Sequence, residues 1–299
     1  MLIKHIPIPI ACLALSMLSL GNLLDIPNVK YLFGIMGVIL LILLIAKALV
    51  YPEDIRNDFK NIVLASSSGT FSMSLMLLST YTIGFLPIIS HYIWIIGIGM
   101  HILLMIYFTY HFIIHNLNIN EVYPTYWIVY VGISMVAITS PAHGLKEIGF
   151  IFWIVGFISM IITLPLMIYR YVKYPDLPDA YKPTTCIFAA LMSILIVGYV
   201  NSAPAISIEF LIGLYSLSLV FFMFSFYKLV EYRTLKFYPS FAAFTFPFVI
   251  SGLATKNITK IVGSNTLLSS IQTIETMIAI IVVFYVLFEY YGFLNKNKF

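Results

Sequence analysis

Three histidines in the second half of one apolar segment and directly after it are the first candidates for chemistry. His111 and His115 are four residues apart, the spacing of one helical turn, which can hold a metal ion or a haem. His101 lies earlier in the same segment, but no third ligand of a matching type accompanies the pair. A membrane redox enzyme that uses these histidines is therefore a hypothesis that an absorbance spectrum would test. We expect instead no metal, no cofactor and no catalytic residue.

Two carboxylates and two thiols also lie in apolar segments. Glu209 and Glu275 fall near predicted segment ends, where they can meet lipid headgroups or another subunit. A proton-coupling role for Glu275 is the alternative, because an ionisable group inside a membrane is costly unless it is paired. Cys12 and Cys186 are expected to be buried, reduced thiols rather than a disulfide.

An aromatic stretch interrupted by proline occupies residues 241–252, FAAFTFPFVISG. Pro247 has no backbone N–H and kinks a helix. Such a kink beside Phe246 can turn its ring inward and allow it to move. We therefore predict Phe246 as the gate of a pore, supported by Phe244 and Pro247. A phenylalanine that only packs in the core is the alternative interpretation.

The composition requires lipid as the solvent for most of the chain. Of the 299 residues 61% are apolar and 9% charged, and the mean hydropathy is +1.01, whereas a soluble domain carries about a quarter charged residues. Residues 1–21 resemble a signal sequence, but Pro7 and Pro9 favour a first membrane span. The net charge of +4 is not gathered into a basic stripe, so we expect no nucleic-acid partner.

Ten apolar segments are candidates to cross the membrane, which takes about 20 residues per helix. They cover residues 6–24, 31–50, 62–85, 88–114, 125–140, 148–172, 183–203, 206–227, 239–255 and 266–291. Twelve Lys and Arg residues, from Lys4 to Lys298, fall at the two ends and in the even-to-odd connections. The other side holds Lys30, Lys146, Lys256 and Lys260. By the positive-inside rule, both termini are expected in the cytoplasm.

Small, hydroxylated and helix-breaking residues concentrate in the odd-numbered segments. A helix that faces lipid gains nothing from such residues, whereas one that faces helices or water can use their hydrogen bonds. We therefore expect an all-α integral membrane fold, one domain over 1–299, with five helical hairpins, the odd helices around a pore and the even helices outside. Close helix packing is the alternative reason for these residues. The predicted pore-lining residues are Ser68, Ser72, Gly132, Ser134, Thr185, Thr245 and Ser251.

The expected inner ring has no Asp, Glu, Lys or Arg within its segments. Hydroxyl groups and the positive ends of broken helices can solvate a passing anion without trapping it. The absence of a basic residue that could clamp a dicarboxylate also favours passive permeation over a carrier. The sequence thus favours a channel for small anions.

Three motifs resemble one family of membrane proteins. They are AFTFP at 243–247, PIACLALSML from Pro9 and PTYWIVYVGISMVAITS from Pro124. These are similar to the pore helices of the tellurite-resistance/dicarboxylate transporter family, which includes the bacterial TehA proteins, the yeast malate permease and sulfite pump, and the plant guard-cell slow anion channel. Phe246 matches the position of the family's gate. The Gly-rich start of the family's first helix is replaced here, with Pro7 standing where the small residue would accommodate the ring.

The resemblance implies a homotrimer in the plasma membrane whose protomers each hold a pore for small anions. It also leaves a second transport function open, a proton-coupled or exchange carrier for C4-dicarboxylates or for sulfite- and tellurite-type oxyanions. Currents would separate the channel from the carrier.

Overall fold

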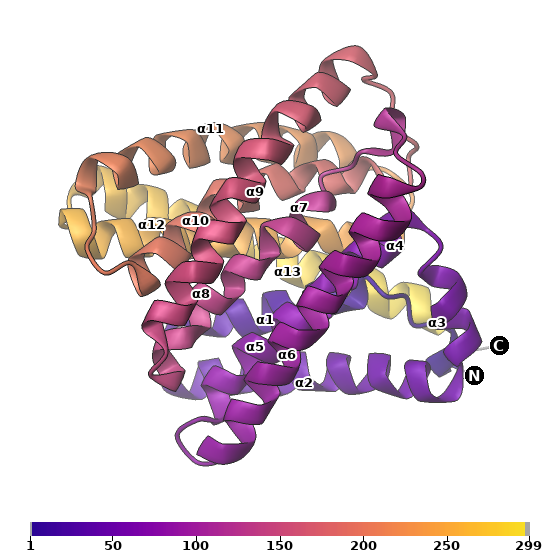
Figure 1. Cartoon of the computed structure of the whole chain (residues 1–299), viewed down its shortest axis with the longest axis horizontal. Helices are drawn as coiled ribbons and strands as arrows, with labels where there is room; N and C mark the ends of the chain where they lie inside the picture. Colours follow the sequence, from indigo (N-terminus) through magenta and orange to yellow (C-terminus); the bar gives the residue numbers. More distant parts are fainter. Residues whose placement is uncertain (1, 297–299) are drawn as a thin grey trace.

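The computed structural model describes residues 2–296, and this part of the chain consists of helices joined by loops, without a β-strand. Lys298, which belongs to the charge count above, lies outside the described residues. The first element, η1 (Leu2–His5), packs near the C-terminal part of α13 (Thr266–Lys296). The chain therefore begins and finishes at the same end of the molecule, on the right of Figure 1.

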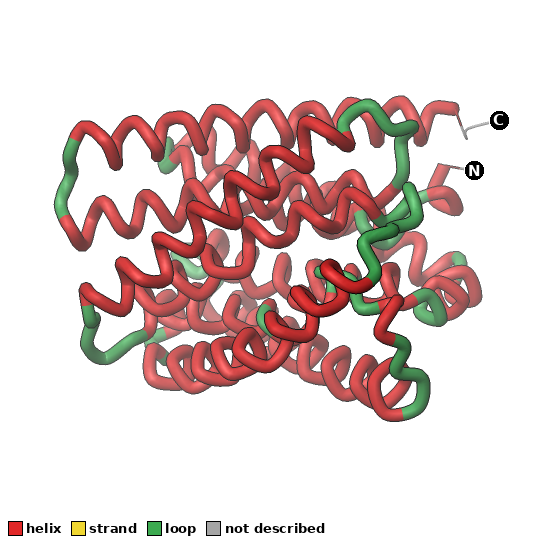
Figure 2. The backbone as a smooth tube through the Cα atoms, turned by 90° about the horizontal axis from the view of Figure 1, so that it is seen from above, coloured by secondary structure: helices red, strands yellow, loops and turns green. Residues whose placement is uncertain are grey.

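Eight helical stretches of the described chain are long and apolar enough to cross a membrane. Figures 1 and 2 show them as a bundle of tilted rods joined by short loops. The protein is thus an all-α, multi-pass membrane protein, as the composition predicted. The stretches are α2 (Pro27–Val50), α4 with α5 (Ile62–Ser67, Gly69–Thr82), α6 with the π-helical η2 (Pro87–Phe108, Thr109–Ile114), α9 (Lys146–Lys173), η6 with α10 (Lys182–Ile187, Phe188–Ser202), α11 (Ile208–Tyr232), η7 with α12 (Pro239–Phe244, Thr245–Val262) and α13.

Two of the ten predicted spans take a different form. The first is α1 (Ile10–Leu24), which is apolar but only 15 residues long. The fifth is broken into four short pieces, α7 (Tyr126–Tyr130), η4 (Gly132–Ser134), α8 (Met135–Thr139) and η5 (Ser140–His143). The break falls at Gly132, which has the lowest helix propensity after proline. Two shorter elements, α3 (Pro52–Asp58) and η3 (Ile119–Glu121), lie in connections.

Burial divides the helices into two classes. In the most apolar window, 72% of residues are buried in Ile62–Thr82, 94% in Lys182–Ser202 and 83% in Pro239–Val262, against 28–33% in the other five stretches. α1, α7 and α8 are also almost wholly buried. We call α1, α5, α7–α8, α10 and α12 the inner helices and α2, α6, α9, α11 and α13 the outer helices. The outer helices expose aliphatic side chains that suit lipid, such as Leu103 and Val172.

Outer helices approach inner helices closely where they carry glycine. A Cβ atom on Gly156 of α9 would lie 2.0 Å from the hydroxyl oxygen of Ser134. A Cβ atom on Gly97 of α6 would lie 3.0 Å from the backbone oxygen of Ser72. Both glycines therefore permit a helix contact that any larger residue would force apart. Small residues thus serve helix packing in both classes of helix.

Candidate functional site

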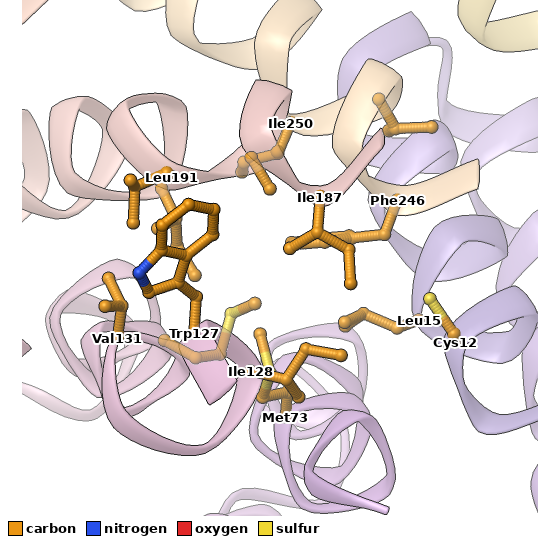
Figure 3. Packing of buried hydrophobic residues seen from close by; sticks show 14 of the residues in the cluster. Cys12, Leu15, Met73, Trp127, Ile128, Val131, Ile187, Leu191, Phe246 and Ile250 are labelled. Atoms are coloured by element: carbon orange, nitrogen blue, oxygen red, sulfur yellow. The ribbon is translucent and has the colours of Figure 1, made fainter. Parts of the chain in front are cut away.

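A small cavity lies where all five inner helices meet. Its volume is about 30 Å³, enough for a water molecule or two. Figure 3 shows the surrounding side chains converging from opposite sides on this space. We call it the central cavity. Its lining is Cys12 from α1; Thr70 and Met73 from α5; Trp127, Ile128, Val131 and Gly132 from α7 to η4; Ile187, Ala190, Leu191 and Ile194 from η6 and α10; and Phe246 and Pro247 from α12.

The ring of Phe246 extends from α12 into the central cavity, near Ile187 and Cys12 (Figure 3). The ring is 5% exposed. The chain changes from the 3₁₀ helix η7 to α12 just before it, at Thr245. Thr245 donates a hydrogen bond to the Ala242 carbonyl (2.7 Å) and accepts one from Ser16 of α1 (2.6 Å). These bonds and Pro247 fix the point from which the ring enters the cavity.

The central cavity offers an ion almost no polar partner. Its one hydroxyl, that of Thr70, already donates to the Ser67 carbonyl at 2.7 Å. The thiol of Cys12 is a weak donor, and no charged side chain takes part in the lining. Moving an ion into such a space without replacing its hydration costs many kcal/mol. The cavity is therefore a barrier to ions as it stands.

A wider, open cavity lies on the same inner helices farther from the termini. Its volume is about 320 Å³, and we call it the vestibule. Each inner helix contributes to both spaces, and on each one a residue that lines the central cavity is followed, seven positions later, by a residue that lines the vestibule. The five helices therefore run in the same direction, and the two spaces are about 10 Å apart along them. The pairs are Cys12 with Ser19, Met73 with Thr80, Val131 with Ile138, Ile194 with Asn201 and Phe246 with Leu253.

The vestibule carries charge. Lys256 and Lys260 of α12 and Asp25 line it. The Lys256 ammonium lies 3.0 Å from the Asp25 carboxylate and 3.1 Å from the Leu23 carbonyl, at the negative end of α1. This hydrogen bond holds the pKa of Asp25 below its ordinary value, despite a small opposing effect of burial. Two lysines and one aspartate leave an excess of one positive charge in the lining of the vestibule.

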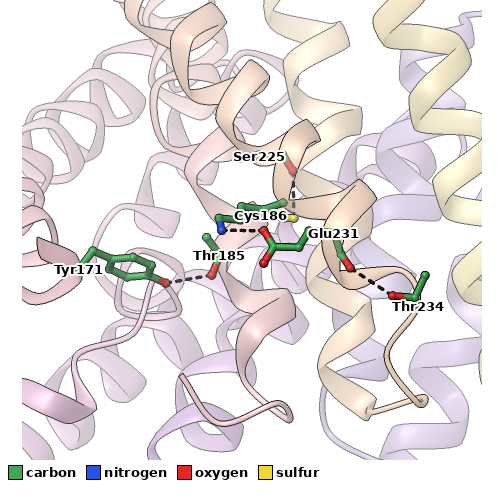
Figure 4. A network of polar contacts seen from close by, with 7 residues as sticks. Tyr171, Thr185, Cys186, Ser225, Glu231 and Thr234 are labelled. Atoms are coloured by element: carbon green, nitrogen blue, oxygen red, sulfur yellow. Dashed lines mark hydrogen bonds and ion pairs between the residues drawn. The ribbon is translucent and has the colours of Figure 1, made fainter. Parts of the chain in front are cut away.

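The predicted pore-lining residues divide into two groups. Of these residues Gly132 lines the central cavity, together with Phe246 and Pro247, the predicted gate and its support. The hydroxyl of Ser72 turns to an outer helix, where it lies 2.7 Å from His101 of α6. The hydroxyl of Thr185 likewise lies 3.1 Å from that of Tyr171 of α9, as Figure 4 shows.

The other predicted residues also bond or pack away from the two spaces. Ser68 donates to the Ala65 carbonyl, and Ser134 faces Gly156 of α9. Ser251 lies 3.1 Å from Ser193 of α10. Phe244 is fully buried and packs on Phe241 at 5.0 Å between ring centroids. Pro7 precedes α1, and its carbonyl accepts a hydrogen bond from Ile10.

The residues that sequence reasoning singled out for other chemistry have protein partners. His101 is fully buried, with Nδ1 at 2.7 Å from Ser72 and Nε2 at 3.0 Å from the Val129 carbonyl. Cys12 and Cys186 are buried free thiols. Glu275 is buried and accepts a hydrogen bond from Thr255. Over residues 2–296, no three His, Cys, Asp or Glu side chains come close enough to hold a metal ion.

Sequence reasoning missed most of the two spaces. The apolar lining residues Met73, Trp127 and Leu191 carry no polar signal that could mark them. The predicted ninth span ends at residue 255, which leaves Lys256 in a loop. α12 in fact continues to Val262 and carries Lys256 and Lys260 on its last turns. The two lysines are four residues apart, and this spacing, which places both on one face of a helix, could have indicated that the helix continues past residue 255.

Comparisons with known proteins relate the chain to a family of membrane transport proteins. A family model described as voltage-dependent anion channel matches residues 5–290. An uncharacterized transporter of Methanocaldococcus jannaschii is 27% identical over 205 residues, which are 62% of this chain and 59% of the relative. The chain thus aligns with about three fifths of the length of that relative.

Proposed function

The chain belongs to the voltage-dependent anion channel family, the tellurite-resistance/dicarboxylate transporter family that its motifs resemble, and on that premise we propose that it conducts small anions passively through a pore gated by Phe246. The pore runs from the vestibule through the central cavity, along the axis of the five inner helices. The observation that carries the proposal is the parallel lining of both spaces, with a residue of every inner helix in each.

The described conformation corresponds to the closed pore. Phe246 and its apolar neighbours leave a space of about 30 Å³ without a charged or free polar group, and a narrow apolar constriction blocks ions by excluding water. Opening requires the ring to leave the cavity. Pro247 removes a backbone hydrogen bond at this position, which lowers the cost of moving the chain that carries the ring.

The topology follows from the same parallel arrangement. Because the five inner helices run in one direction, we propose that each outer helix returns the chain and that ten crossings form five hairpins. The short α1 and the broken 126–143 segment then count as full crossings, buried where lipid does not reach them. With both termini in the cytoplasm of a cell membrane, the vestibule opens outward. We further propose a homotrimer of such protomers, each with a complete pore.

The proposal is tested by chloride efflux from liposomes that contain the purified protein. Phe246→Ala removes the ring and is expected to raise efflux at least about tenfold, which corresponds to ~1.4 kcal/mol of barrier. Phe248→Ala is the matched control, since Phe248 is buried on the same helix but packs on Phe222 of α11. Efflux that stays unchanged in correctly inserted Phe246→Ala would remove Phe246 from the gate.

A carrier for C4-dicarboxylates or for sulfite- or tellurite-type oxyanions is the second candidate function. Glu275 favours it, because this buried carboxylate bonds to Thr255, the residue before Lys256 of the vestibule. A carrier that uses Glu275 for protons would lose uptake driven by a pH gradient in Glu275→Gln. For the channel we expect no such uptake in the wild type. The currents of Glu275→Gln should then be within about twofold of the wild-type currents. Glu209→Gln, which changes an exposed carboxylate, is the control.

A further inference from the structure

Two histidines meet at the end of the molecule that carries the vestibule, outside the two spaces described above. His91 is the fifth residue of α6, and His143 is the last residue of η5. Their Nδ1 atoms are 3.4 Å apart. Both rings line an open cavity of about 540 Å³ at the protein surface.

The separation of the two nitrogens suits a metal ion better than a hydrogen bond. Good N–H hydrogen bonds have donor–acceptor distances of about 2.7–3.2 Å, and 3.4 Å is longer. Two nitrogen ligands on one tetrahedral Zn²⁺, each at about 2.0–2.1 Å, are about 3.3–3.4 Å from each other. The rings therefore already have the spacing of a ligand pair.

The tautomer of His143 follows from its partner Ser79. The Ser79 hydroxyl has one proton, which it donates to the Met76 carbonyl at 2.6 Å. Its oxygen, 2.8 Å from His143 Nε2, must then accept a hydrogen bond from that nitrogen. His143 consequently carries its proton on Nε2 and directs the lone pair of Nδ1 toward His91. A hydrogen bond on the remote nitrogen is how proteins orient metal-binding histidines.

The surroundings keep this lone pair available. Trp94 stacks on the His143 ring at 4.7 Å and lies 5.9 Å from the His91 ring, which fixes both planes. A metal ion binds the neutral imidazole through the nitrogen that carries no proton, which in His143 is Nδ1. The cavity leaves room for the water ligands that two histidines do not replace.

We propose that His91 and His143 form a two-histidine site for a divalent transition metal of the zinc and copper class. With two protein ligands the site binds metal reversibly and is not a structural zinc centre. Bound metal would join α6 to η5 beside the vestibule, because Pro141 and Ala142 line the vestibule immediately before His143. The site thus places a metal contact next to the wall of the mouth.

Fluorescence of the purified full chain tests the proposal, since Trp94 touches both rings. Cu²⁺, which binds such sites more tightly than Zn²⁺, should quench part of the emission at one saturable site per chain, and Zn²⁺ added first should shift the quenching to higher Cu²⁺ concentrations. Trp94→Phe should lose that part of the signal. Quenching that does not saturate, or that a large excess of Zn²⁺ leaves unshifted, would overturn the proposal.

Variants locate the ligands. His91→Gln and His143→Gln should each weaken Cu²⁺ binding at least about tenfold, and Ser79→Ala should weaken it less, through the orientation of His143. His115→Gln is the control, because His115 is exposed and bonds within its own segment, to the Tyr110 carbonyl. Binding that is equal in the double histidine variant and the wild type would overturn the assignment. Electron paramagnetic resonance of Cu²⁺ bound to the unaltered protein gives an independent check. A spectrum with two coordinated imidazole nitrogens would support the site, and a spectrum with none would contradict it.

Discussion

The central cavity and the vestibule are built on the same five helices seven residues apart, yet their chemistry is opposite. The cavity is small and apolar, and the ring of Phe246 enters it, whereas the vestibule is wider and holds Lys256, Lys260 and Asp25. About two helical turns therefore separate an apolar space from a charged one. In the pore that we propose, the charges attract anions and the ring excludes them, so that moving the ring leaves the charges unaltered.

The accessibility of Cys12 is the strongest way to break this comparison. Cys12 is 6% exposed and lies in the cavity beside Phe246. In a Cys186→Ala background, a charged thiol reagent added from the vestibule side should react negligibly with Cys12. With Phe246→Ala in addition, the rate should rise by about two orders of magnitude, because the thiol gains access to water. Mass spectrometry of labelled protein over time measures it.

The control for this prediction keeps the helix and changes the ring. Phe248→Ala in the same background should leave Cys12 as unreactive as before, since Phe248 does not line the cavity. Equal labelling in the two alanine variants would mean that general loosening of α12, and not removal of a plug, exposes the thiol. Fast labelling without any substitution would show that the cavity is already open to the vestibule.

How far the sequence predicted this design depends on the scale. Hydropathy located the helices, and the odd-numbered segments 62–85, 183–203 and 239–255 correspond to the three most buried long stretches. The sequence could not show how each helix is rotated about its own axis, and therefore which of its faces points toward the axis of the bundle. The hydroxyl of Ser72 bonds to the Gly69 carbonyl of its own helix and to His101, so hydroxyl content marks an inner helix without marking the face toward the axis.

The apolar lining was hidden for a related reason. In a chain with 61% apolar residues, Met73 or Leu191 differs from its neighbours only by where it points. Phe246, which lines the cavity, could be singled out in the sequence because a proline beside an aromatic ring is a local feature. The seven-residue step from cavity to vestibule depends instead on the relative heights of five separate segments. The relative heights of the segments are set by contacts between helices, such as the contact of Gly156 with Ser134. A sequence pattern does not contain these contacts.

Removal of charge from the vestibule should produce a smaller effect than opening the cavity. Lys256→Gln in the Phe246→Ala background takes away a positive charge and leaves Asp25 without its ion pair. One charge about 8 Å from an anion is worth ~0.5 kcal/mol in water, so chloride efflux at low salt should fall about two- to threefold. Lys146→Gln, on the same predicted side but outside the vestibule lining, should leave efflux unchanged.

Salt separates this electrostatic effect from damage to the fold. Lys256 also bonds to the Leu23 carbonyl, so its loss can loosen the contact between α12 and α1. An electrostatic effect should disappear at about 1 M salt, where the Debye length is ~3 Å. A reduction that persists at high salt would assign Lys256 to packing and contradict the role of the vestibule charge.

The smallest expected effect belongs to Asp25, the negative charge of the vestibule. Its pKa is held below 3.8, chiefly by the hydrogen bond from Lys256, so Asp25 is ionised at neutral pH and is neutralised only as the pH falls through that lowered value. Asp25→Asn in the Phe246→Ala background should therefore raise chloride efflux up to about twofold at pH 7 and low salt. The parent with Asp25 should show a rise of the same size only on acidification below pH 3.8, and Asp25→Asn should lose that rise. The matched control is Asp176→Asn, since Asp176 lies outside the vestibule lining. An acid-induced rise that survives in Asp25→Asn would belong to another group and would remove Asp25 from the electrostatics of the mouth.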